Sequence, residues 1–358
     1  MTKARIVRSR LRLLGSGLAF PGVPISTIEL LTRIEQNFDV PSRTGAALAR
    51  RLGVNLRHHS RDWRQRLEAP RPGHRNPELA SLAVIDALAQ ADLSAQQLQY
   101  LIGHTTTPAR LLPPNISEVA NRLGLEAPYG ELRQACTGFA NALQWASGLL
   151  AAKDAAPVAI VGSEVGSVFF DPLALNSEPG QWVNLMQMGD GAGAVVLGPD
   201  DGAPGPYLES LYFGHIGLDR QPGFMLEEGG SDYPAVRQGR VTSTFHHEYE
   251  SVKEDGLLLF QAGLAAAQEA GVELKKISAI LPHQANGNIG NWLARALRLP
   301  PALFWGNAAH VGNLGSAAIW VALHELRHSG RLSPGDRVLV LGAEATHYLY
   351  GGFVYVHA

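Results

Sequence analysis

The chain has 358 residues, of which 46% are hydrophobic and 17% charged, and its formal net charge is −2. This balance excludes a disordered chain, and the length is sufficient for two domains with sizeable cores. The near-neutral charge argues against nucleic acid as a partner, and no apolar run reaches the roughly 18 residues that a membrane span requires.

The compartment is indicated by the single cysteine and by the first residues. One cysteine cannot form a disulfide within the chain, which fits a reducing compartment. The N-terminal stretch is basic and then apolar, as in a signal peptide, but Arg10 and Arg12 interrupt the apolar run, and residues 11–20 fit a first strand and turn better. We therefore expect a cytoplasmic protein without a membrane partner.

Apolar runs that end in glycine alternate with amphipathic stretches, which is the pattern of an α/β protein. Residues 77–92 are predicted to form a helix with five apolar side chains near one face: Leu79, Leu82, Ala83, Ile85 and Leu88. The other predicted elements of the first half are a strand, a helix, a strand and a glycine-rich turn that enters a strand: residues 98–108, 114–125, 156–166 and 188–199.

The densest cluster of Gly, Pro and Asp lies at residues 197–207 and predicts a boundary, which gives domains at 1–205 and 206–358. Residues 213–250 are polar, aromatic and irregular, and we expect a loop there. Helix, strand, two helices and two strands follow: residues 251–272, 277–286, 288–299, 315–330, 336–346 and 351–358. The two halves therefore have similar element orders.

The first candidate for chemistry is Cys136, between a short predicted strand and a predicted helix with Phe139, Leu143, Ala146 and Leu150 at helical spacing. At a helix N-terminus, unpaired backbone N–H groups and the helix dipole favour a thiolate. A lone cysteine is nevertheless more often a small buried apolar residue.

Two later segments strengthen the case for a catalytic cysteine. His283 follows the end of a predicted strand, and Asn313 precedes a predicted helix; alone, each would be interpreted as a loop histidine or a helix-capping asparagine. With Cys136 they resemble the β-ketoacyl-ACP synthase III family of thiolase-fold enzymes. The matches are A-C-x-G-F at 135–139, GDGAGAVVL at 189–197, P-H-Q-A-N at 282–286 and G-N at 312–313. The resemblance extends from about residue 80 to the end, whereas the first 70 residues match poorly.

The resemblance implies a five-layered αβαβα thiolase fold with two pseudo-symmetric halves, a homodimer, and no cofactor. It also implies that Cys136 carries the acyl group and that His283 and Asn313 donate hydrogen bonds to an enolate. The backbone N–H groups of Cys136 and Gly352 would form a second oxyanion hole. The expected substrate pocket includes Leu112, Phe139 and His347.

The implied reaction is a Claisen condensation between an acyl group on the cysteine and a malonyl or β-ketoacyl thioester, with substrates delivered by CoA or by an acyl carrier protein. One alternative is an acyltransferase on the same fold that passes the acyl group to an alcohol or amine. Another, from a different class, is a non-catalytic partner subunit of a heteromeric synthase, but the intact Cys–His–Asn set argues against it.

The motif HELRH at 324–328 matches the zinc-binding H-E-x-x-H pattern and would suggest a zinc hydrolase. The apolar face of this predicted helix carries Ile319, Leu323 and Leu326, so His324 and His328 are expected to face solvent. With no third ligand evident, we expect no metal.

Several positions depart from the family pattern. Gly287 and Asn288 follow P-H-Q-A-N where the family has a carrier-docking arginine, and the tryptophan and arginine that bind the CoA adenine have no clear counterpart. The C-terminal loop is extended and includes Glu344 and His347. These departures favour specialised fatty-acid or polyketide metabolism over general fatty-acid initiation.

Overall fold

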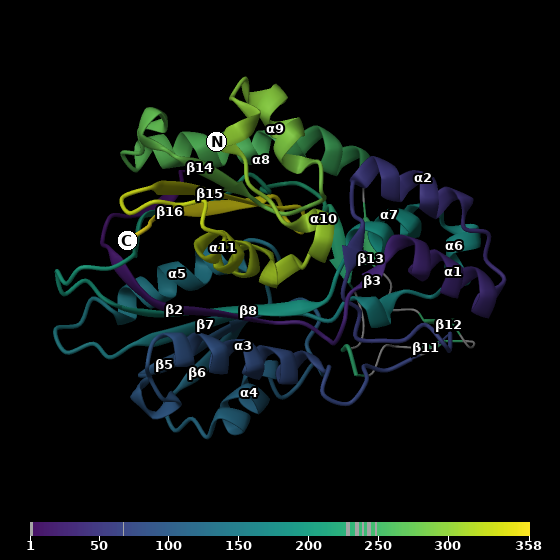
Figure 1. The fold of residues 1–358 in the computed structure, drawn as a ribbon, viewed down its shortest axis with the longest axis horizontal. Coiled ribbons are helices and arrows are strands. Elements are labelled where there is room, and N and C mark those ends of the chain that lie inside the picture. The colour runs from purple at the N-terminus through teal and green to yellow at the C-terminus, as the bar shows by residue number, and fades with distance from the viewer. Residues whose placement is uncertain are drawn as a thin grey trace.

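A computed structural model shows five alternating layers of helices and strands (Figure 1). It describes residues 3–66, 68–226, 230–232, 236–237, 240–241, 245–247 and 249–358. Parts of the expected loop at 213–250 therefore lie outside the described residues. In the described part of the chain, no helix is long and apolar enough to cross a membrane.

The lower strand layer in Figure 1 is built by the first half of the chain. Strand β5 is parallel to β6 and to β7, β7 is antiparallel to β8, and β8 is antiparallel to β2. These strands are β2 (Leu11–Ala19), β5 (Tyr100–His104), β6 (Tyr129–Leu132), β7 (Val158–Glu164) and β8 (Gly191–Pro199). Helices α3 (Asn76–Gln90) and α4 (Asn115–Leu123) cover the outer face.

The upper strand layer repeats this arrangement with the second half of the chain. Strand β14 is parallel to β15, β15 is antiparallel to β16, and β16 is antiparallel to β9, which also pairs with β1. These strands are β1 (Arg5–Val7), β9 (Tyr207–His215), β14 (Ala279–Pro282), β15 (Arg337–Glu344) and β16 (Leu349–Val356). Helices α8 (Tyr249–Glu269) and α9 (Ile289–Leu297) cover the outer face.

The two strand layers are joined where Leu11 and Arg12 of β2 pair with β9. Helices α5 (Gly138–Leu149) and α11 (Ala318–His328) fill the layer between them (Figure 1). Phe139 of α5 contacts Trp320 and Phe353 edge to face, with ring centroids 5.8 and 5.9 Å apart. Each such fully buried aromatic side chain stabilises the fold by roughly 1.5–3 kcal/mol relative to exposure.

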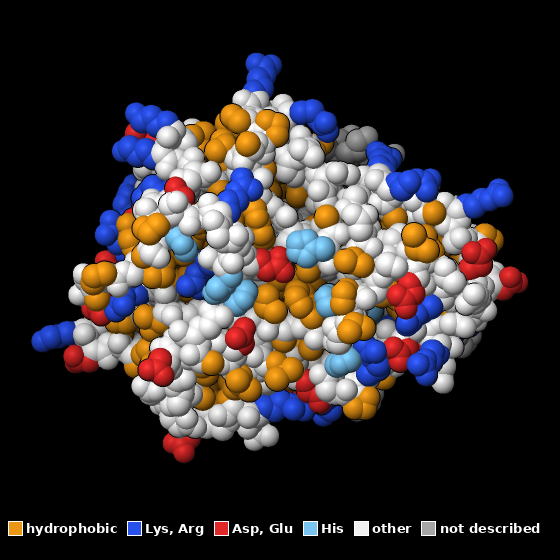
Figure 2. Space-filling view, in the orientation of Figure 1, with side chains coloured by type: hydrophobic (Ala, Val, Ile, Leu, Met, Phe, Trp, Pro, Cys, Tyr) orange, Lys and Arg blue, Asp and Glu red, His pale blue; other side chains and the backbone are white. Residues whose placement is uncertain are grey.

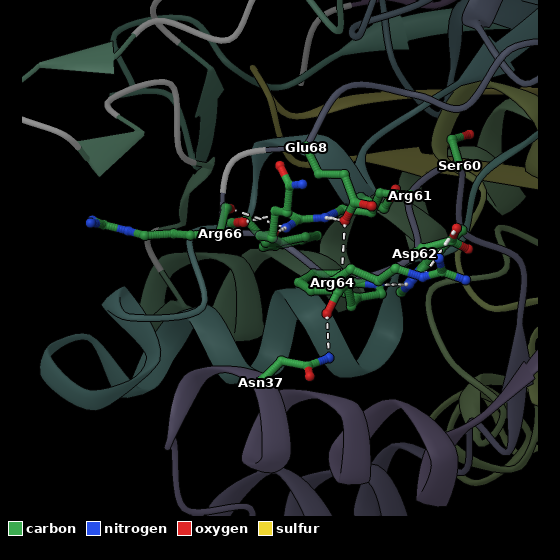
Figure 3. Close-up of polar contacts among 12 residues, drawn as sticks. Asn37, Ser60, Arg61, Asp62, Arg64, Arg66 and Glu68 are labelled. Atoms are coloured by element: carbon green, nitrogen blue, oxygen red, sulfur yellow. Dashed lines mark hydrogen bonds and ion pairs between the residues drawn. The ribbon is translucent and has the colours of Figure 1, made fainter.

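Helices α1 (Thr27–Phe38), α2 (Arg43–Leu52), α6 (Ala174–Ser177) and α7 (Pro179–Gln187) form a separate group on the right of Figure 1. We call these helices, together with the arginine-rich segment 57–75, the cap. Figure 3 shows polar contacts that hold this segment, among them the ion pair between Arg61 and Glu68. Arg61 also donates to the Phe170 carbonyl at 2.9 Å, and Asn37 donates to the Trp63 carbonyl at 2.8 Å. The remaining short elements are β3 (Ile25–Ser26), β4 (Leu56–Arg57), β10 (Phe224–Leu226), β11 (Val236–Arg237), β12 (Arg240–Val241), β13 (Phe245–His247) and α10 (Ala308–Val311).

The observed elements agree with most of those predicted from the sequence, with two differences. On α3, Leu82 and Ile85 are 51% and 50% exposed, because the buried stripe runs through Leu79, Ala83 and Leu88 instead. Part of the expected loop at 213–250 is ordered into the end of β9 and into strands β10 and β13. The expected boundary at residues 205 and 206 falls in the loop between β8 and β9, and as a domain boundary it stays a prediction.

Candidate active site

A cavity of about 1000 Å³ brings together Cys136, His283 and Asn313, which are far apart in the sequence. Its apolar wall is formed by residues of the cap and of α8 and α9: Leu48, Leu52, Val183, Leu259, Phe260, Ile289 and Trp292. Its polar wall near the cysteine contains Thr106, Glu164, Glu344 and Thr346. A cavity of this kind can hold an apolar chain with its reactive end at the cysteine.

Cys136 lies in the turn between β6 and α5, directly before the helix-capping residue Thr137. The helix N-terminus predicts a lowered thiol pKa, but the structure gives the opposite balance. Burial raises the pKa of Cys136 well above its ordinary value, and the nearby Glu344 and Glu164 carboxylates raise it further. The resting side chain is therefore a thiol, and its proton must leave when sulfur attacks a thioester.

His283 directly follows β14, and its backbone N–H donates to the Leu341 carbonyl of β15 at 2.8 Å. Burial lowers the pKa of His283 to about 4, so the imidazole is neutral at pH 7. Its buried Nδ1 has no hydrogen-bond partner in the described structure. In the tautomer with hydrogen on Nε2, the buried Nδ1 is only an unpaired acceptor, which costs less than a buried unpaired N–H. The Nε2–H is then the donor that is available to a ligand in the cavity.

Asn313 is fixed by the strand-like segment that enters β8. Its backbone N–H donates to the Gln187 carbonyl at 2.6 Å, and its carbonyl accepts from Gly189 at 3.0 Å. Its side-chain oxygen accepts from the Gly315 N–H at 3.0 Å, as in helix capping. Because the oxygen is occupied, the amide nitrogen is the free end, and the described residues provide no acceptor for it. It is therefore a donor available to a ligand.

Two buried groups that were not assigned from the sequence support this site. Glu164, at the end of β7, accepts hydrogen bonds from Thr106, Thr107 and Ser316, and so ties three loops together beside the cavity. His104 accepts from Trp320 Nε1 at 3.1 Å, and burial lowers its pKa to about 3. The only sequence signals were an acidic residue at a strand end and a histidine in an apolar strand.

The remaining predicted site residues do not line the cavity. Gly352 lies within β16, where its register opposite Leu341 and Tyr212 places it inside the sheet. Phe139 is fully buried in the core between the strand layers, because its helical position faces Trp320 and Phe353. In this chain Leu112 is 81% exposed on the loop before α4, and His347 is exposed beside Gly217.

The segment that does face the cavity is 343–346, at the end of β15. The cavity is also lined by Arg51 of α2 and Arg295 of α9, which are both exposed, and by Trp292, one helical turn before Arg295. Sequence reasoning found no counterpart for cationic and aromatic binding residues, because these two helices approach each other only in the folded chain. Neither arginine forms an ion pair with a described residue.

The histidines of HELRH are placed differently from each other. His328 is exposed, as expected, but His324 is partly buried, with its Nδ1 3.1 Å from Ser16 Oγ and 3.0 Å from the Ser16 carbonyl. The prediction that His324 faces solvent was therefore wrong, because α11 packs against β2. Figure 2 shows several histidine side chains over the region of α10 and α11, but in the described part of the chain no three His, Cys, Asp or Glu residues are arranged to hold a metal.

The five layers and the cavity shared by a cysteine, a histidine and an asparagine define the class of thiolase-fold condensing enzymes. Two family models match: "3-Oxoacyl-[acyl-carrier-protein (ACP)] synthase III" over residues 131–212, and its C-terminal counterpart over residues 267–355. The chain belongs to this family of 3-oxoacyl-ACP synthase III condensing enzymes, as its similarity to curated members establishes.

Among these relatives, a 3-oxopimeloyl-ACP synthase of Rhodothermus marinus is 32% identical over 345 residues, which cover 94% of this chain and 91% of the relative. A β-ketoacyl-ACP synthase III of Streptomyces coelicolor is 33% identical over 79% of each chain. Among solved structures, the tetronic acid condensing enzyme AbyA1 has a TM-score of 0.82 and 27% identity, covering 97% of this chain and 99% of that one. A structure of Xanthomonas campestris OleA, at 18% identity and a TM-score of 0.79, supports the fold alone.

Proposed function

We propose that this condensing enzyme holds its acyl group as a thioester on Cys136 and uses His283 and Asn313 to stabilise the enolate of the second substrate. The observation that carries this proposal is the arrangement of three side chains at one cavity. One is a nucleophile at a helix N-terminus, one is a neutral imidazole, and one is an amide whose free end is its donor.

In the first half-reaction, the sulfur of Cys136 attacks the carbonyl carbon of an acyl thioester and displaces the carrier thiol. The backbone N–H of Cys136 and the N-terminal turn of α5 stabilise the negative charge that develops. In the second half-reaction, a malonyl or β-ketoacyl thioester forms an enolate, which accepts hydrogen bonds from His283 Nε2 and Asn313 Nδ2. Each preorganised donor of this kind is worth roughly 10²–10³ in rate.

The acyltransferase alternative shares the first half-reaction but not the second. Passing an acyl group to an alcohol or amine produces no enolate on a second thioester, so it gives no role to an amide donor fixed beside the cysteine. The orientation of Asn313 by Gly315 therefore favours condensation. Ordinary transfer remains the second candidate, since the same acyl-Cys136 would serve it.

We further propose that an acyl carrier protein delivers at least one substrate, as the printed names of the curated relatives indicate for those enzymes. Arg51 and Arg295 lie at the cavity rim on two different helices, and both are exposed. Such cations attract a phosphopantetheine phosphate and the acidic surface of a carrier protein. The apolar wall limits which acyl chains fit, and the series of thioesters described below measures the preferred chain length.

A cytoplasmic homodimer completes the proposal. Strand β6 lies at the end of the strand order and is an unpaired sheet edge in the single described chain. Leu111 and Leu112, on the neighbouring loop, are exposed apolar side chains. Pairing of two such edges would bury both features. Light scattering coupled to size-exclusion chromatography should give twice the mass of the chain, and a monomer at micromolar concentration would contradict this.

The experiment that tests the function is intact-mass spectrometry of the purified enzyme after incubation with acyl-CoA and acyl-carrier thioesters of increasing chain length. We expect one acyl adduct per chain, on Cys136, formed fastest with a carrier-bound or longer chain rather than with acetyl-CoA. Addition of malonyl-CoA or a β-ketoacyl thioester should discharge the adduct and yield a product with a new carbon–carbon bond. Discharge to alcohols or amines alone would establish the acyltransferase instead.

A further inference from the structure

Glu344 is a buried carboxylate at the catalytic cavity with no role in the reaction described so far. It ends β15, is 3% exposed, and lines the same cavity as Cys136, His283 and Asn313. Burying a carboxylate costs several kcal/mol unless hydrogen bonds or charges compensate, so a carboxylate beside a nucleophile is a candidate for function.

Hydrogen bonds fix Glu344 directly against the nucleophile turn. Its Oε2 accepts from the Thr137 backbone N–H at 2.8 Å and from Thr137 Oγ1 at 2.7 Å, and Thr137 is the residue that follows Cys136. Its Oε1 accepts from Thr346 Oγ1. Since each carboxylate oxygen can accept two hydrogen bonds, Oε1 retains one free acceptor position. This oxygen is the one available to a substrate.

Glu164, the other carboxylate at the cavity, provides an internal comparison. Its Oε1 accepts from the backbone and hydroxyl groups of both Thr106 and Ser316, and its Oε2 accepts from Thr107. An oxygen with four donors has no capacity left for a proton from a ligand. Glu164 accepts five hydrogen bonds in all and Glu344 accepts three, so Glu164 is the more fully tied of the two carboxylates.

The carboxylate also bears on which second substrate suits the cavity. A malonyl thioester forms its enolate by losing carbon dioxide and needs no base, and its own carboxylate would be repelled by Glu344. A β-ketoacyl thioester carries no charge near the reacting carbon, but it must lose a proton from C2 to form the enolate. A fixed carboxylate within reach meets that requirement, because general bases contribute roughly 10²–10⁴ in rate.

We propose that Glu344 is the catalytic base that removes the C2 proton of a β-ketoacyl thioester, so that this enzyme condenses its acyl-Cys136 with a β-keto carbon acid without decarboxylation. The proposal rests on the function given above. The C2 proton moves to Glu344 Oε1, while His283 and Asn313 hold the enolate oxygen. C2 then bonds to the acyl carbonyl carbon, the bond from that carbon to Cys136 sulfur breaks, and the thiolate takes the proton from Glu344.

The last transfer closes the cycle, since the enzyme returns to a thiol and a carboxylate. Burial and the Glu344 charge raise the pKa of Cys136, which favours return of the proton to sulfur. The second half-reaction therefore needs no external proton donor or acceptor.

The test compares a β-ketoacyl thioester with a malonyl thioester as the second substrate of the same acyl-enzyme. Wild-type enzyme and Glu344→Gln are acylated with octanoyl-CoA, or with the panel thioester that labels wild-type enzyme fastest. The decay of the adduct is then followed by intact mass after mixing with 3-oxooctanoyl-CoA or with malonyl-CoA. Glutamine keeps an acceptor oxygen for Thr137 but is not a base. Glu344→Asp keeps the carboxylate one methylene further back, and Glu325→Gln removes a partly exposed carboxylate that does not line the cavity, as the matched control.

We expect Glu344→Gln to slow consumption of 3-oxooctanoyl-CoA by about 100-fold or more, while acylation of Cys136 and the malonyl reaction stay within about threefold or improve. Glu344→Asp should lie between, and Glu325→Gln should match wild type. Equal losses with both substrates, no loss with either, or a wild-type acyl-enzyme that malonyl-CoA alone discharges would overturn the role of Glu344. These outcomes leave the condensing function intact, whereas failure of wild-type enzyme to form any adduct refutes that function itself.

Discussion

At the residue scale, the orientation of Asn313 depends on one hydrogen bond, from the Gly315 N–H to its side-chain oxygen. An aspartate would keep this acceptor and lose the donor that faces the cavity. The substitution therefore separates the fold of the loop from its proposed chemistry, which an alanine substitution cannot do.

We predict that Asn313→Asp folds normally and acylates Cys136, but that malonyl decarboxylation and condensation fall by roughly 10²–10³, because one enolate donor is lost and a like charge is added. Stopped assays of carbon dioxide release measure the effect. Asn121→Asp, at an exposed position on α4, is the control and should be unaffected. Retained decarboxylation in Asn313→Asp would show that the amide is not an enolate donor.

His283→Ala should behave in the same way without adding charge. Acylation of Cys136 should persist, while condensation falls by at least tenfold, a change of about 1.4 kcal/mol in barrier. Single-turnover measurement of each half-reaction distinguishes the two effects. Loss of acylation alone, with enolate formation intact, would assign His283 to the first half-reaction.

The three residues proposed as catalytic could be singled out from the sequence because each lies in a short motif that resembles the family, and the structure places all three at one cavity. The cavity wall could not be predicted in the same way. Phe139 lies only three residues after Cys136, but its position on the helix places its side chain in the core. Gly352 lies within the sheet because of its register opposite Leu341. Glu344 was visible only as an unusual residue in a long loop, since its partner Thr137 lies 207 positions away.

At the element scale, β7 and the turn at Gly315–Ala317 approach each other so closely that only glycine fits at position 162. A Cβ on Gly162 of β7 would lie 2.3 Å from the Ser316 carbonyl oxygen and 2.7 Å from the ring of His104. Backbone atoms cannot move away as a flexible side chain can. This contact therefore sets the distance between β7 and the turn that follows Asn313.

Gly162→Ala is predicted to destabilise the protein by about 1–3 kcal/mol through overpacking, as measured by urea denaturation. Gly148→Ala is the matched control, since Gly148 lies near the end of α5 with no atom within 4 Å of an added Cβ. That substitution should raise stability by about 0.5–1 kcal/mol through helix propensity. Equal stability of the two variants would contradict the packing described.

Most helices and strands of the five layers could be predicted, because apolar runs and helical periodicity determine them locally. The cap could not, since its arginine-rich segment shows no such periodicity. Arg57, for example, is fully buried and donates to the carbonyl of the nearby Val54 and to that of Met186 in α7, which is 129 positions away. Its conformation depends on tertiary contacts that a single sequence does not display.

At the scale of the whole molecule, burial holds many histidines in their neutral form. The pKa is lowered, chiefly by burial, at His58, His59, His74, His104, His283, His324 and His357. The unfolded chain binds more protons than the folded chain between these pKa values and about 6.5. Their stabilisation is therefore complete above pH 6.5 and is lost as the pH falls.

We predict that the free energy of unfolding falls between pH 6.5 and about pH 5, with His104 and His283 each accounting for about 1.5 kcal/mol. Urea denaturation at a series of pH values measures this slope. Glu325 raises the pKa of His310, so this histidine stabilises the fold more as the pH falls. Its contribution to the free energy of unfolding is small, because the pair is exposed. His283→Ala should flatten the slope and the exposed His328→Ala should not; a flat wild-type profile would contradict the neutral state of the buried histidines.

The claim on which the whole account depends is that carbon–carbon bond formation proceeds through an acyl thioester on Cys136. Wild-type enzyme and Cys136→Ala are each incubated with an acyl thioester, and the second thioester is then added while adduct mass, carbon dioxide and product are followed. We expect an adduct and a condensed product for wild type. For Cys136→Ala we expect neither, with slow malonyl decarboxylation retained through His283 and Asn313. Condensed product from Cys136→Ala, or a wild-type adduct that is discharged without a new carbon–carbon bond, would contradict the acyl-Cys136 intermediate in condensation.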